Sequence, residues 1–147
     1  MTDIAIQWNV SHGDIAVGDA DLVTDDGLET AVLLSLFLDR RADADDGVSI
    51  DDDPRGWWGD SFADDQGDQV GSKFWLLSRE KTVPQLLVRV REYAEQALAW
   101  LVDDGVASSV VAQAELIAQG VVGLSVAITR PNQPPFNRQY QYVWSAV

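Results

Sequence analysis

The chain has 147 residues, of which 46% are hydrophobic, and this is the size and composition of one domain with a sizeable core. It has no cysteine, which excludes disulfides and thiolate metal sites and fits a protein assembled in a reducing cytoplasm. The formal net charge is −14, from 24 acidic and 10 basic residues, so binding to a nucleic-acid backbone is not expected.

The N-terminal segment, taken as 1–24, predicts a β-hairpin. Residues 3–10 alternate between apolar and polar side chains, which indicates a half-buried strand. A turn is expected at 11–14, with His12 exposed in it, and a second short strand is expected at 15–17.

Residues 25–105 are predicted to hold two main helices. The first is expected at about 27–41, with Asp26 as its cap and Glu29 completing a capping box. Its middle, AVLLSLFL, is apolar on nearly all sides, so this helix should be buried against more than one element.

The second main helix has the clearest signals in the chain. Thr82 is a favourable cap, apolar residues recur at helical spacing as far as about Asp103, and Gly105 ends the pattern. A short helix is expected before it at 74–77, opened by Ser72.

A long loop, 42–71, separates the two helices. It holds ten aspartates against a single cation, Arg55, and it is longer than compact domains usually tolerate without a function. A solvated mobile loop and a loop that docks on a basic partner are both open readings of this composition. We expect this segment to be disordered in the free protein and to become ordered on assembly.

Trp57 and Trp58 stand side by side in this loop, between Gly56 and Gly59. Adjacent bulky aromatic side chains in a polar loop either pack onto the core or contact another protein. We expect one of them to pack and the other to face a partner.

The C-terminal segment, 106–147, changes to strand patterns. Residues 110–117 and 124–129 alternate around a Gln119-Gly120 turn, which predicts an antiparallel hairpin. A last strand is expected at its end, carrying Tyr140, Tyr142 and Trp144. The predicted fold class is α+β, an antiparallel sheet packed with two main helices in a single domain, 1–147.

Four stretches together carry a family resemblance. They are DDGLETAVLLSLFLDRRA at 25–42, RGWWGD at 55–60, GSKFWLLSREK at 71–81 and REYAEQALAWLVDDGV at 91–106. With them the chain resembles the Mu-type phage tail baseplate wedge family. That family is itself similar to the wedge and sheath-initiator proteins of contractile tails and type VI secretion, some of which are called lysozyme-like.

The resemblance implies a structural part of a contractile injection device, located in the virion tail and assembled in the host cytoplasm. Its implied partners are other baseplate wedge proteins, the tail sheath protein, and tail hub or tube proteins, with several copies around a sixfold axis. It carries over no catalytic, cofactor-binding or metal-binding residue. Neither nucleic acid nor a membrane is an expected partner.

Candidate interface residues follow from the residue patterns and from this resemblance together. They are Trp57, Trp58, Arg79, Glu80, Tyr140, Tyr142 and Trp144. Buried aromatic anchors dominate interface energies, and Arg79 with Glu80 can form charge-assisted bonds, either across an interface or within the chain. By this resemblance the last strand can add to a strand of the sheath, since sheath proteins link by strand exchange. The N-terminal hairpin around His12 is the alternative sheath contact.

One departure from the related initiators concerns the end of the long helix. Those proteins carry a Glu-Pro-Arg motif there, whereas this chain reads Asp103-Asp104-Gly105. The contact that the motif makes in the initiators is therefore not carried over.

Other functions fit the same residues less well. An acidic DNA-mimic inhibitor is the main alternative, but it requires carboxylates in two rows, whereas these concentrate in one loop. A calcium-binding loop with Gly47 or Gly67 at its sixth position would lack an oxygen ligand at its first position. Glycoside hydrolysis needs two carboxylates held at a fixed separation, and no pattern in the sequence indicates such a pair. No apolar run approaches membrane-spanning length, and residues 1–9 lack the pattern of a secretory signal.

Overall fold

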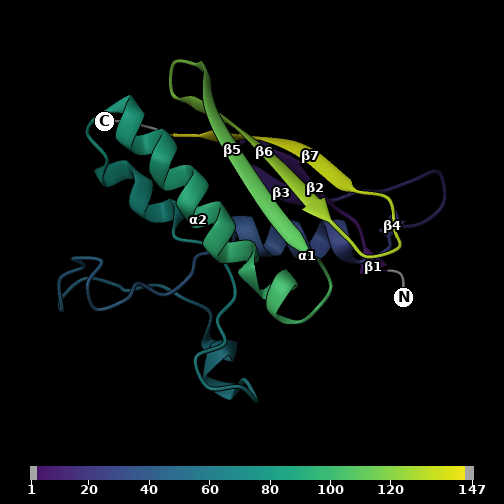
Figure 1. The fold of residues 1–147 in the computed structure, drawn as a ribbon, viewed down its shortest axis with the longest axis horizontal. Helices are drawn as coiled ribbons and strands as arrows, with labels where there is room; N and C mark the ends of the chain where they lie inside the picture. Colours follow the sequence, from purple (N-terminus) through teal and green to yellow (C-terminus); the bar gives the residue numbers. More distant parts are fainter. Residues whose placement is uncertain (1–2, 145–147) are drawn as a thin grey trace.

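The computed structural model describes residues 3–144 and has two layers, a sheet and a pair of helices (Figure 1). The sheet is antiparallel in the order β5-β6-β7, with β5 at Ser109–Ala118, β6 at Val121–Thr129 and β7 at Phe136–Val143. Helices α1 and α2 pack with one face of this sheet around the core. The α+β class is confirmed, as is the hairpin of β5 and β6.

Helix α2, Val83–Asp103, follows its sequence signals closely. The Thr82 hydroxyl accepts a hydrogen bond from the backbone N–H of Gln85 at 3.4 Å, which satisfies one of the helix's unpaired first-turn donors. Gly105 follows the helix with φ 76°, a backbone conformation that is unfavourable for residues other than glycine. The buried stripe is Leu86, Val90, Ala94, Ala97, Leu98 and Leu101.

Helix α1, Leu28–Phe37, is shorter than predicted and is capped differently. Gly27 holds the cap position, and the Asp25 carboxylate accepts from the backbone N–H of Gly27 at 2.6 Å and of Thr30 at 3.2 Å. The predicted cap Asp26 accepts only from Leu28 N–H, at 3.2 Å. The capping-box prediction for Asp26 and Glu29 is therefore wrong.

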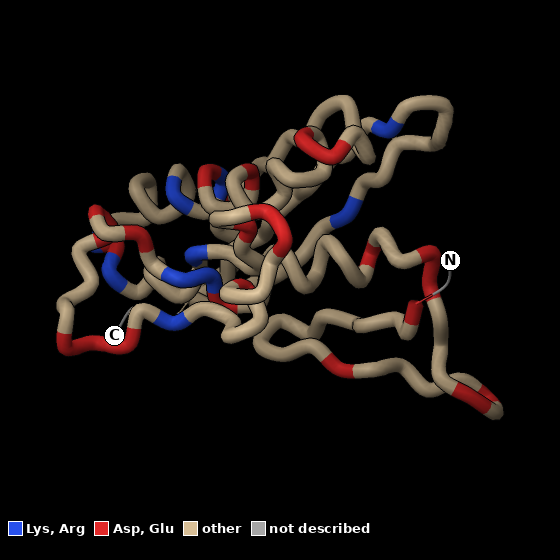
Figure 2. The backbone as a smooth tube through the Cα atoms, turned by 90° about the horizontal axis from the view of Figure 1, so that it is seen from below, with Lys and Arg blue, Asp and Glu red and all other residues tan. Residues whose placement is uncertain are grey.

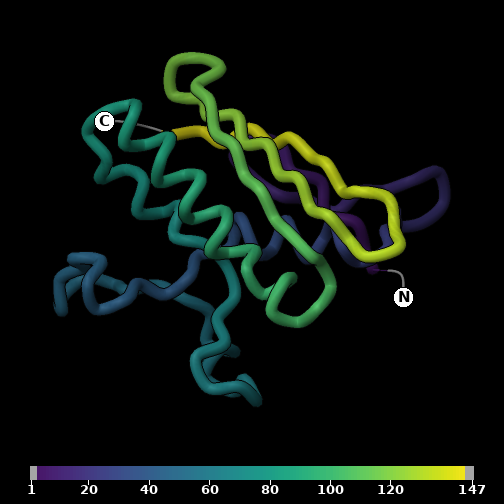
Figure 3. Tube along the Cα trace, viewed as in Figure 1, coloured from purple at the N-terminus to yellow at the C-terminus, as the bar shows by residue number. Residues whose placement is uncertain are grey.

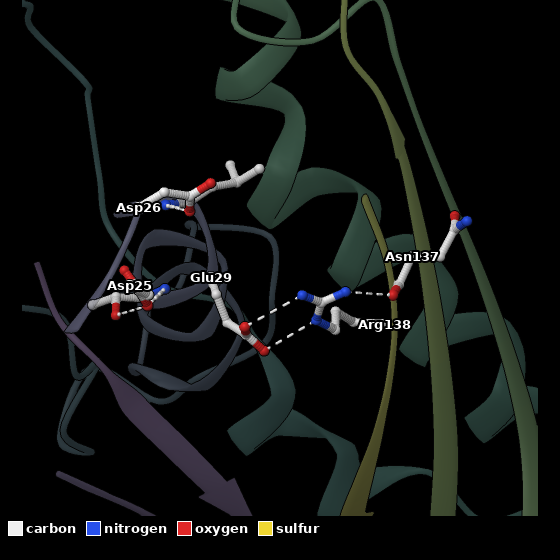
Figure 4. Close-up of polar contacts among 7 residues, drawn as sticks. Asp25, Asp26, Glu29, Asn137 and Arg138 are labelled. Atoms are coloured by element: carbon white, nitrogen blue, oxygen red, sulfur yellow. Dashed lines mark hydrogen bonds and ion pairs between the residues drawn. The ribbon is translucent and has the colours of Figure 1, made fainter. Parts of the chain in front are cut away.

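Glu29 reaches across to the sheet instead (Figure 4). Its carboxylate pairs with the guanidinium of Arg138 on β7, with 3.2 Å between Oε1 and Nε. An acidic side chain in the first turn still complements the helix dipole, and here it also joins α1 to the last strand.

The N-terminal segment forms two small antiparallel pairs rather than one long strand. Strand β1, Asp3–Ile4, pairs with β4, Thr24–Asp25, and strand β2, Ile6–Asn9, pairs with β3, His12–Ile15. The predicted turn at 11–14 is wrong, because His12 is already paired with Asn9 in the ladder. The turn is the two-residue Val10-Ser11, the shortest loop that joins antiparallel strands.

The β2–β3 hairpin is attached to the core and to the last strand. The indole of Trp8 stacks on the ring of Phe37, with centroids 3.7 Å apart and planes within 4°. Its Nε1 donates to the carbonyl of Gln141 at 2.7 Å, and the N–H of Val143 donates to the carbonyl of Val10 at 3.2 Å. The β2–β3 hairpin is thus bonded to the end of the last strand.

The long loop leaves and rejoins the body at one place, and Figure 3 shows it projecting as two extended lobes. Ser72 N–H donates to Leu38 O and Arg40 N–H donates to Ser72 O, each at 2.9 Å, which closes the base of the loop. Gly71 is required there: its φ is 98°, and a Cβ atom would overlap the carbonyl of Leu38. The structure has a 3-10 helix within the loop, η1 at Trp58–Phe62, and another directly after it, η2 at Phe74–Arg79.

Within the described residues, no helix combines the length and the apolar character needed to cross a membrane.

Candidate protein–protein interface

Three aromatic side chains gather on the lobe of the loop that contains η1. We call Trp57, Trp58 and Phe62 the aromatic cluster. The rings of Trp57 and Trp58 lie 5.7 Å apart, and those of Trp58 and Phe62 lie 5.9 Å apart and nearly perpendicular. Their exposed fractions are 52%, 75% and 78%. Such a concentration of exposed aromatic surface is typical of a binding site.

Local hydrogen bonds hold the aromatic cluster in a defined turn. The N–H of Asp60 donates to the carbonyl of Trp57 at 3.1 Å, and the hydroxyl of Ser61 donates to the carbonyl of Trp58 at 2.7 Å. The indole of Trp57 folds over Gly59, where a Cβ atom would overlap the ring. The cluster is therefore largely pre-organised, which lowers the entropic cost of binding.

Arg55 fixes this lobe to the body of the protein. Its guanidinium pairs with the Asp39 carboxylate at 2.7 Å and lies 4.8 Å from the centre of the Trp75 ring. The indole N–H of Trp75 donates to the carbonyl of Arg40 at 2.8 Å. The third tryptophan of this region thus anchors the loop, while Trp57 and Trp58 both remain exposed, so the expectation that one of them packs onto the core is wrong.

Phe62 is absent from the sequence-derived candidates. It lies four residues after Trp58, and only the η1 helix brings the two rings together. The signal in the sequence was this aromatic spacing, but the surrounding Gly and Asp residues indicated an irregular loop.

The other lobe of the loop is bound by a buried cation. Lys73 has a side chain only 6% exposed, and its ammonium group lies 2.6 Å from the carboxylate of Asp43 and 2.8 Å from that of Asp46. Burial alone would raise the pKa of Asp46, but the hydrogen bond and charge of Lys73 outweigh it and lower the pKa. Burial likewise opposes the charge of Lys73, yet the two carboxylates raise its pKa.

Arg79 and Glu80 both have partners within the chain. The guanidinium of Arg79 donates to the carbonyl of Asp46 at 3.1 Å, which holds the same lobe. The carboxylate of Glu80 lies 3.6 Å from the guanidinium of Arg89 on α2. Of the two readings left open by the sequence, these contacts support the intramolecular one.

The predicted interface aromatics at the C-terminal end lie in the core, two of them on β7 and Trp144 directly after it. Tyr140 and Trp144 are 7% and 8% exposed, and Tyr142 is half-buried. The rings of Tyr140 and Tyr142 pack on Phe37, and the indole N–H of Trp144 donates to the carbonyl of Leu77 at 2.9 Å. Burial raises the pKa of the Tyr140 hydroxyl, with a contribution from the charge of Glu29.

An interface made by those three side chains would require the core to open. What β7 offers to a partner is its backbone edge, since it is an outer strand of the sheet. The β2–β3 hairpin already occupies the end of that edge, at Gln141 and Val143. The edge beside Asn137 and Gln139 is the part that remains for strand addition. Residues 145–147 lie outside the described residues.

Comparison with known proteins supplies a family. A family model described as "Phage protein GP46" matches residues 28–135. The chain is 45% identical to "Baseplate protein gp46" of Escherichia phage Mu over 148 residues, covering 100% of both chains. It is 41% identical to "Mu-like prophage FluMu protein gp46" of Haemophilus influenzae over 145 residues, covering 99% of both.

Proposed function

The chain belongs to the phage protein GP46 family, and from this premise we propose that it is a structural component of a contractile phage tail baseplate. The predicted resemblance to a Mu-type baseplate family is confirmed by full-length relatives. Within the baseplate, the chain joins wedge subunits and starts the tail sheath, in several copies around the sixfold axis. Its place is the virion tail, and it acts as one folded unit without catalysis.

The observation that carries this proposal is the exposed aromatic cluster on a clamped, pre-organised loop. A baseplate subunit must hold several neighbours at once, so it needs strong anchor residues on surfaces that its own fold leaves uncovered. Trp is among the residues most enriched in interface hot spots, and two of them stand here with a phenylalanine.

The DNA-mimic alternative gains no support from the arrangement of charge. Figure 2 shows acidic residues on loops, turns and helices on different sides of the molecule. Several of them are paired with cations, namely Glu29, Asp39, Asp43, Asp46, Glu80 and Glu92.

The wedge role is tested by co-expressing the chain with the other tail genes and isolating the complexes that form. We expect the wild-type chain to co-purify with wedge proteins and to be present in intact tails. Recovery of a free monomer alone, with tails that lack the chain, would contradict the baseplate role.

The sheath role is tested at the outer edge of β7. Because the backbones of Gln141 and Val143 face away from β6, the period of two in a strand directs the N–H of Gln139 the same way. Gln139→Pro then removes an outward donor without breaking the β6 ladder. We expect normal wedge assembly but short or absent sheaths by electron microscopy, and full-length sheaths would show that this edge is not the docking strand.

A further inference from the structure

An open groove of about 480 Å³ separates the aromatic cluster from the two main helices. Leu34 and Ala31 of α1 and Trp100 of α2 form one wall, and Trp57, Phe62 and Val70 of the loop form the other. This volume lies within the range of sites that accept bulky ligand groups.

The floor of the groove has its polar groups satisfied internally. The indole N–H of Trp100 donates to the hydroxyl of Ser35 at 3.0 Å, and that hydroxyl donates to the carbonyl of Ala31 at 2.8 Å. Leu34, on the exposed side of α1, keeps 37% of its surface open. The interior of the groove is therefore suited to an apolar side chain.

The rim of the groove is acidic. Asp60, Asp68 and Asp104 line it, and no lysine or arginine is among the described residues that do. The Asp60 carboxylate accepts from the N–H of Val70 through Oδ1 at 3.2 Å, while its Oδ2 is shielded from solvent and has no donor among the described residues. Asp68 and Asp104 are exposed, so their carboxylates can pair with an incoming cation.

We propose that this groove binds a basic segment of another tail protein, which inserts one bulky apolar side chain between Leu34, Phe62 and Trp100 and places lysine or arginine on the acidic rim. That the partner is a tail protein rests on the proposed function. Charge complementarity selects the chemistry of the segment, because the whole chain carries −14. The same charge disfavours a second copy of this chain.

Site-specific photo-cross-linking tests the identity of the occupant. A benzophenone amino acid replaces Leu34 inside the groove or, as the control, Val88, which is 48% exposed on α2 and nine residues before the groove residue Ala97. Nine residues on a helix correspond to the opposite face. After illumination of assembled baseplates, mass spectrometry identifies the linked peptide.

From position 34 we expect a product with a lysine- or arginine-rich segment of another tail protein, and from position 88 we expect no product with that segment. A position-34 product with an acidic or neutral segment or with a second copy of this chain, or no product at all, would overturn the proposal. If the chain is missing from purified tails, the baseplate role fails and the inference fails with it. If the chain is present without this cross-link, only the inference fails.

Charge substitutions supply a second readout. Leu34→Arg puts a cation among the acidic groups and obstructs the groove, so incorporation into baseplates should fall by roughly tenfold or more. Val88→Arg, an equivalent change outside the groove, should have no effect. Asp68→Lys reverses a rim charge on an exposed loop without touching a helix, so it keeps the test decisive if Leu34→Arg misfolds. Normal incorporation of a folded Asp68→Lys variant together with a folded Leu34→Arg variant would refute the groove assignment.

Discussion

The loop 42–71 and strand β7 both present runs of aromatic residues, yet the fold gives them opposite roles. In β7, alternate positions point to one face, so Tyr140 and Tyr142 pack on Phe37, and Trp144 directly after the strand bonds to Leu77. In the loop, Trp57 and Trp58 are adjacent, so they cannot share one side of a strand, and the η1 turn leaves both exposed with Phe62. The same kind of apolar surface stabilises the fold in one region and remains available for binding in the other.

The largest expected effect comes from removing Trp144, the aromatic residue directly after β7. Trp144→Ala should lower the free energy of unfolding by about 3–5 kcal/mol, because it opens a cavity and leaves the carbonyl of Leu77 without its donor. Urea denaturation followed by circular dichroism measures this change. The neighbouring Val143→Ala, at an exposed position, should change it by less than about 0.5 kcal/mol. Equal effects at 143 and 144 would contradict the core placement.

Removing an aromatic residue of the loop should weaken binding and leave folding stability unchanged. Trp57→Ala or Trp58→Ala should leave a soluble folded protein but weaken the proposed assembly with wedge subunits by roughly 2–4 kcal/mol, which is the range of interface hot spots. Binding of the purified variants to the isolated partner subunits measures this loss. Ile50→Ala, a 98% exposed position in the same loop, is the matched control. Unfolding of the tryptophan variants with unchanged partner binding would make these residues part of the core.

The ion pair between Lys73 and Asp46, which holds the other lobe of the loop, should make the stability of the protein depend on pH. Asp46→Asn should cost about 1–2 kcal/mol at pH 7, since a charge-assisted hydrogen bond to Lys73 is weakened. Because the folded pKa of Asp46 is lowered, the wild type has this stability at pH values above 3.8 and loses it as the pH falls through the folded pKa. The two unfolding curves should therefore converge in acid, with the exposed Asp45→Asn as the control. If the stability difference between the wild type and Asp46→Asn instead grew in acid, the pKa of Asp46 would be raised in the folded protein, not lowered.

Hydrogen exchange tests whether the loop is ordered in the free protein. The sequence predicts disorder over 43–70, whereas the structure ties one lobe to Lys73 and Arg79 and the other to Asp39. We expect the amides that donate within these turns, such as those of Asp46 and Asp60, to exchange more slowly than the rest of the segment. Uniformly fast exchange across the loop in the free protein would restore the sequence-based prediction.

The smallest effect is expected at the ion pair between Glu29 and Arg138 (Figure 4). Both side chains are partly exposed, so Glu29→Gln should lower stability by at most about 1 kcal/mol, and less at high salt. Thermal melts at low and high salt measure it. A large and salt-independent loss would indicate that Glu29 serves the fold in another way.

Regular periodicity made much of the fold predictable from sequence. The limits of α2, the β5–β6 hairpin and the α+β class all follow from spacing and from the Thr82 and Gly105 signals. The cap of α1 did not, because Asp25 and Asp26 are equivalent in the sequence and only the β1–β4 pairing places Asp25 beside Thr30.

The candidate site was less predictable than the fold. An aromatic residue carries the same hydrophobicity whether it ends in the core or on the surface, so the patterns did not separate Trp58 from Trp144. The groove depends on contacts between α1, α2 and the loop over distances in sequence that no local pattern encodes.

The bond from Trp8 to Gln141 spans 133 positions of the chain, which sets an order of events during synthesis. While the ribosome is still adding residues, the first hairpin has no strand to rest against, and Phe37 lacks the rings of Tyr140 and Tyr142. The native arrangement closes only after nearly all of the chain has emerged, as expected for a fold with long-range pairing. A chain cut short by premature termination would therefore be incomplete at both ends, and the cell's proteases could remove it before it entered a growing tail.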